Sequence, residues 1–107
     1  MTDETAQFIG QQLHAAVQRE HGGYCSVGLE TSCVRDGVGL FRFHVDLRLS
    51  MMVVRCFVSC CVAQNTLHDR EMLKQRLQAV VGTMARQCLA NAAIAVQKKL
   101  REQAQYN

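Results

Sequence analysis

The chain has 107 residues, of which 49% are hydrophobic and 20% are charged, and its formal net charge is +3. These values are typical of a folded domain and exclude a disordered chain or a polybasic arm. There is no proline, so nothing indicates a linker, and we treat residues 1–107 as a single domain. The most apolar run, 51–63, is interrupted by Arg55 and Ser59 and is too short to span a bilayer. With no leader recognisable in residues 1–10, we expect an intracellular protein with no membrane partner.

The first predicted element is a helix that begins at Thr2 or Asp3 and ends before Gly22. Asp3 suits the positive end of the helix dipole, and glycine is typical of a helix C-cap. Its apolar positions, with Ile9 and Leu13 among them, recur at helical spacing and form one stripe. We therefore expect this helix to cover one face of a sheet.

The next predicted elements are a strand over residues 24–34 and a hairpin turn. Apolar and polar side chains alternate along this strand, and the pattern places Cys25 and Cys33 on the same face. Asp36-Gly37 is a strong hairpin signal. The strand is therefore predicted to pair with the one that follows it.

The register of this hairpin depends on the length of its loop. A two-residue loop would pair odd-numbered with even-numbered positions and mix the two faces of the sheet. A three-residue loop over 35–37 pairs Leu29 with Phe43 and sets Glu30 opposite Arg42, which is a favourable charge pair. We therefore predict a bulged three-residue loop.

The stretch 38–63 is predicted to form two consecutive strands, and it holds most of the large apolar residues. Between Phe41 and Leu49 the alternation is strict, so one face is core and the other is polar. From Met51 onward both faces are mostly apolar. A single strand of this length would be roughly 85 Å long at ~3.3 Å per residue, so we place a bend near 49–52. A strand that is apolar on both faces needs cover on both sides, from helices or from a second copy of the protein.

The last predicted element is a long helix, in which apolar residues recur at i, i+4, i+7 spacing from Leu73 onward. Thr66 and Asp69 have the spacing of a capping box at its start. If it continues unbroken through Gly82 to about Glu102, it is roughly 54 Å long at ~1.5 Å per residue and overhangs a domain of this size. Either it breaks or kinks at Gly82, or its C-terminal half meets another chain, and we favour the second. The predicted fold is α+β, with a three-stranded antiparallel sheet and the order α-β-β-β-α.

The six cysteines are predicted to be structural. Most of them occupy apolar positions of a strand or helix pattern, where a free thiol packs as a small hydrophobe. No C-x-x-C pair occurs, and the nearest approach to a metal-ligand set is Cys60, Cys61 and His68. We therefore expect a reducing compartment, no metal and no cofactor.

The search for catalytic residues yields one weak candidate, His44 with Asp46 on the polar face of a strand, flanked by Arg42 and Arg48. A carboxylate beside an imidazole can orient it for acid–base work. No nucleophile is tied to this pair by spacing, and exposed strand faces often carry such residues. We therefore expect no enzymatic activity and infer no small-molecule substrate.

These observations predict a non-catalytic oligomerisation or assembly module that binds a second copy of itself or another protein. The predicted contact residues are apolar positions in excess of what one chain can readily bury: Met51, Val53, Phe57, Met84, Cys88, Val96 and Leu100. The alternative is a small dimeric nucleic-acid-associated protein that makes non-specific phosphate contacts through its basic last helix. The residues predicted for that role are Arg70, Lys74, Arg76, Lys98, Lys99 and Arg101.

Two short segments resemble a known family. Residues 39–43 (Gly-Leu-Phe-Arg-Phe) open a strand, residues 69–73 (Asp-Arg-Glu-Met-Leu) open the last helix, and these, with the size and element order, resemble the YbaB/EbfC nucleoid-associated family. The resemblance implies a homodimer that binds DNA without much sequence preference and has no catalytic activity. The third strand departs from the family, being longer, more apolar and rich in cysteine. The double-stranded RNA-binding domain has the same element order, but its Gly-rich, Lys-Lys helix start is missing from residues 66–70.

Overall fold

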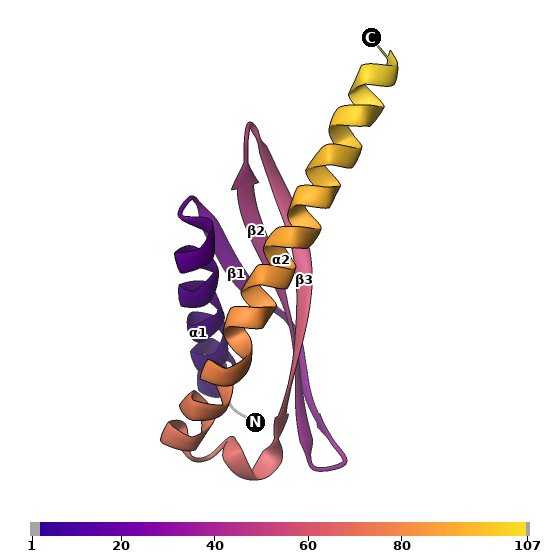
Figure 1. Cartoon of the computed structure of the whole chain (residues 1–107). Coiled ribbons are helices and arrows are strands. Elements are labelled where there is room, and N and C mark those ends of the chain that lie inside the picture. The colour runs from indigo at the N-terminus through magenta and orange to yellow at the C-terminus, as the bar shows by residue number, and fades with distance from the viewer. Residues whose placement is uncertain (1–2, 107) are drawn as a thin grey trace.

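The structure is a computed structural model that describes residues 3–106. The elements in chain order are α1 (Asp3–His21), β1 (Cys25–Arg35), β2 (Val38–Leu49), β3 (Met52–Ala63), a single 3-10 turn η1 (Gln64–Thr66), and α2 (Arg70–Tyr106). The strands form one antiparallel sheet in the order β1-β2-β3, and both helices lie on the same side of it (Figure 1). This confirms the predicted α+β fold and its α-β-β-β-α order. The predicted start of α1 at Thr2 falls outside the described residues.

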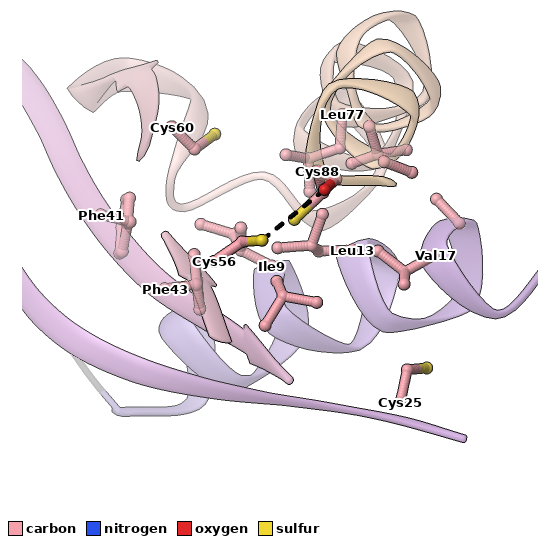
Figure 2. Close-up of a cluster of buried hydrophobic side chains, with 14 of the residues drawn as sticks. Ile9, Leu13, Val17, Cys25, Phe41, Phe43, Cys56, Cys60, Leu77 and Cys88 are labelled. Carbon is pink, nitrogen blue, oxygen red and sulfur yellow. Dashed lines mark hydrogen bonds between the residues drawn. The ribbon is translucent and has the colours of Figure 1, made fainter. Parts of the chain in front are cut away.

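The core lies between the two helices and one face of the sheet (Figure 2). The stripe of α1 that was predicted to cover the sheet is buried there, with Ile9 and Leu13 almost fully enclosed. The largest fully buried side chains come from all the layers: Phe41, Phe43, Ile9, Leu13, Leu47, Leu73, Leu77, Val17, Val45 and Cys88. The strict alternation along β2 therefore encodes the face that the helices cover.

The loop between β1 and β2 differs from the prediction. Arg35 pairs with Val38, so the loop has two residues, Asp36 and Gly37, with φ values of 54° and 76°. Two consecutive positive φ angles are typical of a type I′ turn, whose twist matches that of the strands it joins. The predicted three-residue loop over 35–37 is wrong.

The extra residue that keeps the two faces separate lies in β1 instead of in the loop. The register shifts between Leu29 and Thr31, which makes Glu30 a β-bulge. Leu29 still pairs with Phe43 as predicted, but Thr31, not Glu30, lies opposite Arg42. The bulge moves the rest of β1 by one position, so residues after it face the opposite side from the one that strict alternation predicts.

β2 and β3 are joined by a tight turn at Ser50 and Met51, where the bend was predicted. Pairing continues from Leu49 with Met52 to Val38 with Ala63 without a shift in register. The even-numbered residues of β3 face the helices, and its odd-numbered residues are exposed on the other side. The chain's own helices therefore cover only one face of β3.

The cap of α2 also differs from the prediction. The Asp69 carboxylate accepts a hydrogen bond from the Met72 amide at 3.2 Å, as an N-cap does. The Thr66 hydroxyl donates instead to the Ala63 carbonyl at 2.7 Å, within the 3-10 turn. Thr66 therefore closes the preceding turn and does not cap α2.

α2 runs unbroken through Gly82 for 37 residues, a length of about 55 Å at ~1.5 Å per residue. Ala92 is its last fully buried residue, residues 97–105 are exposed, and its C-terminal end extends beyond the β2–β3 hairpin (Figure 1). This projection explains why the radius of gyration is 15.5 Å, against about 13 Å for a compact domain of this size.

Within residues 3–106, α2 is the one helix that is long and apolar enough to cross a bilayer, judged by length and composition. A helix that packs on a sheet passes the same test, and α2 buries Leu77 and Cys88 in the core. This finding therefore does not assign α2 to a membrane.

Candidate functional site

β3 has one edge that no other strand of residues 3–106 covers. The Gln64 amide donates to the Gly37 carbonyl at 2.8 Å, which extends the β2–β3 ladder by one hydrogen-bonded pair. Hydrogen-bonded and non-bonded pairs alternate along an antiparallel ladder, so the even-numbered residues of β3 direct their backbone groups toward β2. The odd-numbered residues between Val53 and Cys61 therefore direct theirs outward. We call this row of outward backbone groups the β3 edge.

The two outer edges of the sheet differ in how well they are protected against another strand. The Glu30 bulge interrupts the edge of β1, and bulges twist an edge away from pairing. β3 has no bulge over its 12 residues, no proline and no lysine, and Arg55 is its sole charged residue. By these criteria the β3 edge is open to pairing with another strand and the β1 edge is not.

The face of the sheet turned away from the helices, which we call the open face, carries paired charges beside apolar side chains. The Arg55 guanidinium contacts both carboxylate oxygens of Asp46, at 2.8 and 3.1 Å. The hydrogen bond from Arg55 lowers the pKa of the Asp46 carboxyl. The Arg42 guanidinium lies 4.7 Å from the centroid of the Phe57 ring, a cation–π geometry. Asp46 and Arg55 are thus paired within the chain and Arg42 lies against Phe57, while Val53 and Phe57 remain about half exposed.

His44 lies on the same open face, against β1. Its Nδ1 contacts a carboxylate oxygen of Glu30, the bulge residue. Its ring lies over Gly28, where an added Cβ would come within 2.4 Å of the imidazole. Glycine at 28 and the bulge at 30 therefore position His44.

The predicted catalytic pair is not formed. His44 contacts Glu30, and Asp46 pairs with Arg55, so each has a different partner from the one that the sequence suggested. Glu30, which was predicted to pair with Arg42, contacts His44 instead. This arrangement orients His44 without bringing a nucleophilic side chain to it by any contact that the structure records.

We expect Gly28→Ala to destabilise the fold by about 1 kcal/mol, because the new methyl group must push the His44 ring away from Glu30. In a His44→Ala background the same substitution is expected to be neutral, or stabilising by about 0.4–1 kcal/mol, since alanine restricts the unfolded chain. Urea unfolding of the four proteins of this double-mutant cycle measures the difference. Equal losses in both backgrounds would show that the close contact with His44 is not the cause.

Two grooves flank the sheet, one at each edge. The groove between α1 and β1 has a volume of about 420 Å³, and its floor includes Val27, Leu29 and Phe43. The groove between β3 and the start of α2 has a volume of about 530 Å³. We call the second one the β3–α2 groove, and its lining is both apolar and polar: Cys60, Cys61, Val62, Ala63, Asn65, Thr66, Met72, Arg76, Leu77 and Val80. It opens beside the C-terminal half of the β3 edge.

Three of the predicted partner-binding residues lie along β3 and its turn. Met51 is 93% exposed at the turn, and Val53 and Phe57 are exposed on the open face. Exposed apolar side chains in one row are typical of an interaction surface. β3 and its turn therefore expose part of the apolar surface that the sequence predicted to be in excess.

The other four predicted partner-binding residues are on α2 and do not share one surface. Met84 and Val96 are partly buried against the chain's own core, and Leu100 is exposed on the projecting end. Cys88 is 0% exposed. The interpretation of Cys88 as a contact residue needs correction, because the regular spacing that includes it faces the chain's own sheet.

The basic residues predicted for nucleic-acid binding are all exposed, but they fall into two groups. Arg70, Lys74 and Arg76 are at the start of α2, where the Arg70 guanidinium lies 4.4 Å from the centroid of the Phe8 ring. The other three, Lys98, Lys99 and Arg101, are on the projecting end. The 24 residues from Lys74 to Lys98 correspond to about 36 Å of helix. The structure therefore does not bring these charges together.

All six cysteines are free, and four of them are buried: Cys25, Cys56, Cys60 and Cys88. The Cys56 thiol donates to the Cys88 carbonyl at 3.6 Å (Figure 2). Burial raises the pKa of Cys88 to about 12, so this thiol is not a nucleophile. Cys33 and Cys61 are exposed. The bulge in β1 turns Cys33 to the open face and away from the face of Cys25. Among the described residues, no group of three or more His, Cys, Asp or Glu side chains is arranged to hold a metal ion.

Sequence reasoning missed the β3 edge, although a signal for it exists. When three consecutive strands are joined by tight turns, the third one lies at the edge of the sheet unless another strand covers it. It also missed Ile94, which is 63% exposed on α2. Ile94 follows Val80 and Gln87 at intervals of seven residues, and this row lies beside the stripe that faces the core.

Fold and surface together define an α+β domain that has its helices on one face of the sheet and an unprotected apolar edge strand. Comparison with protein-family models, curated proteins and solved structures finds no match to this chain. Its function is therefore inferred from its own residues.

Proposed function

We propose that this protein is a non-catalytic assembly module that self-associates through β3. The single observation that supports this most strongly is the β3 edge, a regular, mostly apolar strand of 12 residues with outward backbone groups and with no bulge, proline or lysine. Such an edge is a template for another strand. Self-association would occupy it and keep it from pairing with unrelated chains.

The alternative, phosphate contact through the basic residues of α2, is less well supported by the arrangement of charge. A backbone-binding surface concentrates its cations along one face. Here the two groups are separated by most of the helix, and Arg70 is engaged with Phe8. The homodimer implied by the resemblance to the YbaB/EbfC family agrees with our proposal, and the DNA binding that it also implies remains a prediction.

Light scattering coupled to size-exclusion chromatography tests self-association. At micromolar concentration we expect a particle of twice the 12.0 kDa mass of one chain, independent of salt between ~50 and ~200 mM, because the contact is apolar and backbone-mediated and not ionic. A monomer throughout this range would contradict the proposal. A monomer that binds a mixed-sequence DNA duplex, with affinity falling at least tenfold over the same salt range, would establish the alternative.

A further inference from the structure

We propose that the second copy adds its β3 antiparallel to the first, with the two-fold axis at Phe57, to make a continuous six-stranded sheet. This inference rests on the proposed self-association and specifies its geometry. The outward backbone groups belong to odd-numbered residues, so an odd-numbered residue of one copy pairs with an odd-numbered residue of the other. The open faces of both copies are then continuous, and the helices of both copies lie on the other side.

The position of the axis follows from overlap and charge. An axis at Arg55 would set two guanidinium groups directly opposite each other, which is destabilising. An axis at Ser59 would leave the residues before Arg55 unpaired. An axis at Phe57 pairs residues 51–63 of one copy with residues 63–51 of the other, which is the longest overlap that β3 and its turn allow. It also gives a cross-strand aromatic pair.

The side chains that this register brings together are compatible. Phe57 lies opposite its equivalent, Arg55 lies opposite Ser59, and Val53 lies opposite Cys61. Arg55 keeps its pairing with Asp46 inside its own chain. Asp46 is on β2, so this contact lies on the side of Arg55 away from the β3 edge. No like charges lie directly opposite each other in the two β3 strands, and the row combines the exposed apolar residues that one copy leaves without cover.

The β3–α2 groove gives independent support. Residues 60–63, which line it, pair in this register with residues 51–54 of the second copy. Met51 and Met52 of the second copy therefore arrive at the mouth of the groove, close to Met72 and Val80. Methionine adapts to irregular apolar spaces. The same register thus explains why a single copy has both an open groove and a methionine that is 93% exposed.

The paired strands alone give a modest contact area. A strand of 12 residues gives a strip about 40 Å long at ~3.3 Å per residue and about 10 Å deep, or about 400 Å² on each copy. The residues that line the β3–α2 groove add to this area where the second copy covers them.

The test is disulfide formation between copies. In a Cys33→Ser background, Val53→Cys places a thiol opposite Cys61 of the second copy, in a hydrogen-bonded pair whose Cα atoms lie about 5.5 Å apart, within disulfide range. Copper phenanthroline with dissolved oxygen serves as the oxidant, and each new S–S bond transfers two electrons to it and releases two protons. We expect most of the protein to run as a covalent dimer on a non-reducing gel. Thr31→Cys, on the open face of β1, is the matched control and is expected to stay uncoupled.

The outcomes separate this inference from the proposal on which it rests. If Arg55→Cys forms the disulfide and Val53→Cys does not, then Cys61 lies opposite residue 55. This result would contradict an axis at Phe57. A dimer by light scattering with no coupling at either position, or with coupling of Thr31→Cys, would overturn edge pairing and leave self-association standing. A monomer by light scattering would overturn both.

Discussion

Phe43→Ala is expected to lower the free energy of unfolding by about 3–5 kcal/mol, which is the usual cost of truncating a buried phenylalanine. The Phe43 ring is 1% exposed and stacks on Phe41, with 6.5 Å between ring centroids. Its other side lies against Gly10 of α1, where an added Cβ would be 3.3 Å from the ring. Removing the ring leaves a cavity where α1 meets the sheet, and domains of this size have only about 5–15 kcal/mol in total. Urea unfolding at a fixed protein concentration measures the loss.

The matched control is Leu100→Ala, which removes an apolar side chain that is 53% exposed on the projecting end of α2. Surface changes of this kind usually alter stability by less than about 0.5 kcal/mol. If both substitutions cost the same, the core would not be where the structure places it.

Ser59→Pro is expected to raise the dissociation constant of the dimer by about 30-fold or more. The Ser59 amide points outward, so proline removes no hydrogen bond of the β2–β3 ladder and is tolerated at such a position. In the dimer it would remove one inter-chain hydrogen bond from each copy and leave a carbonyl unpaired, at a cost of about 1–3 kcal/mol each. Two such losses amount to at least about 2 kcal/mol, and each 1.4 kcal/mol is a factor of ten. Sedimentation over a concentration series measures the change.

Ser32→Pro provides the control on the opposite edge. Arg35 closes the β1–β2 hairpin with Val38, so the amide of Ser32 also points outward, but from β1. We expect this variant to dimerise as the unmodified chain does. Circular dichroism establishes that both proline variants are folded. A dimer of unchanged affinity in Ser59→Pro would show that β3 is not the contact.

The elements and their order could be read from the sequence because their signals are local. Alternation between Phe41 and Leu49 marks the buried face of a strand, and the spacing from Leu73 onward marks a helix. The turn at Ser50 and Met51 was placed by length alone, since one strand could not be as long as the apolar run. Each inference used residues that are close together in the chain.

The extra residue that sets the register was predicted in the loop but lies in β1. Both positions are compatible with the same alternation of apolar and polar residues. Leu29 and Phe43 stay on one face whether the extra residue lies in the loop or in the strand. The choice depends on contacts between strands, with His44 lying over Gly28 and reaching Glu30 in the bulge. The predicted cap of α2 is wrong for a similar reason. Thr66 and Asp69 are both good N-cap residues, and the 3-10 turn engages Thr66.

By itself the sequence determined how many elements there are and which side chains share a face in β2 and in α2. Only the tertiary structure decided what covers each face. Cys88 belongs to the same periodic stripe whether that stripe meets its own sheet or another chain, and β3 is apolar on both faces whether one or both are covered. The spacing of apolar residues along a helix or strand is fixed by backbone geometry over a few residues. Which segment covers a given face depends on packing between segments far apart in the chain. Both helices pack on one side of the sheet (Figure 1), and this is why residues 3–106 leave the open face without cover.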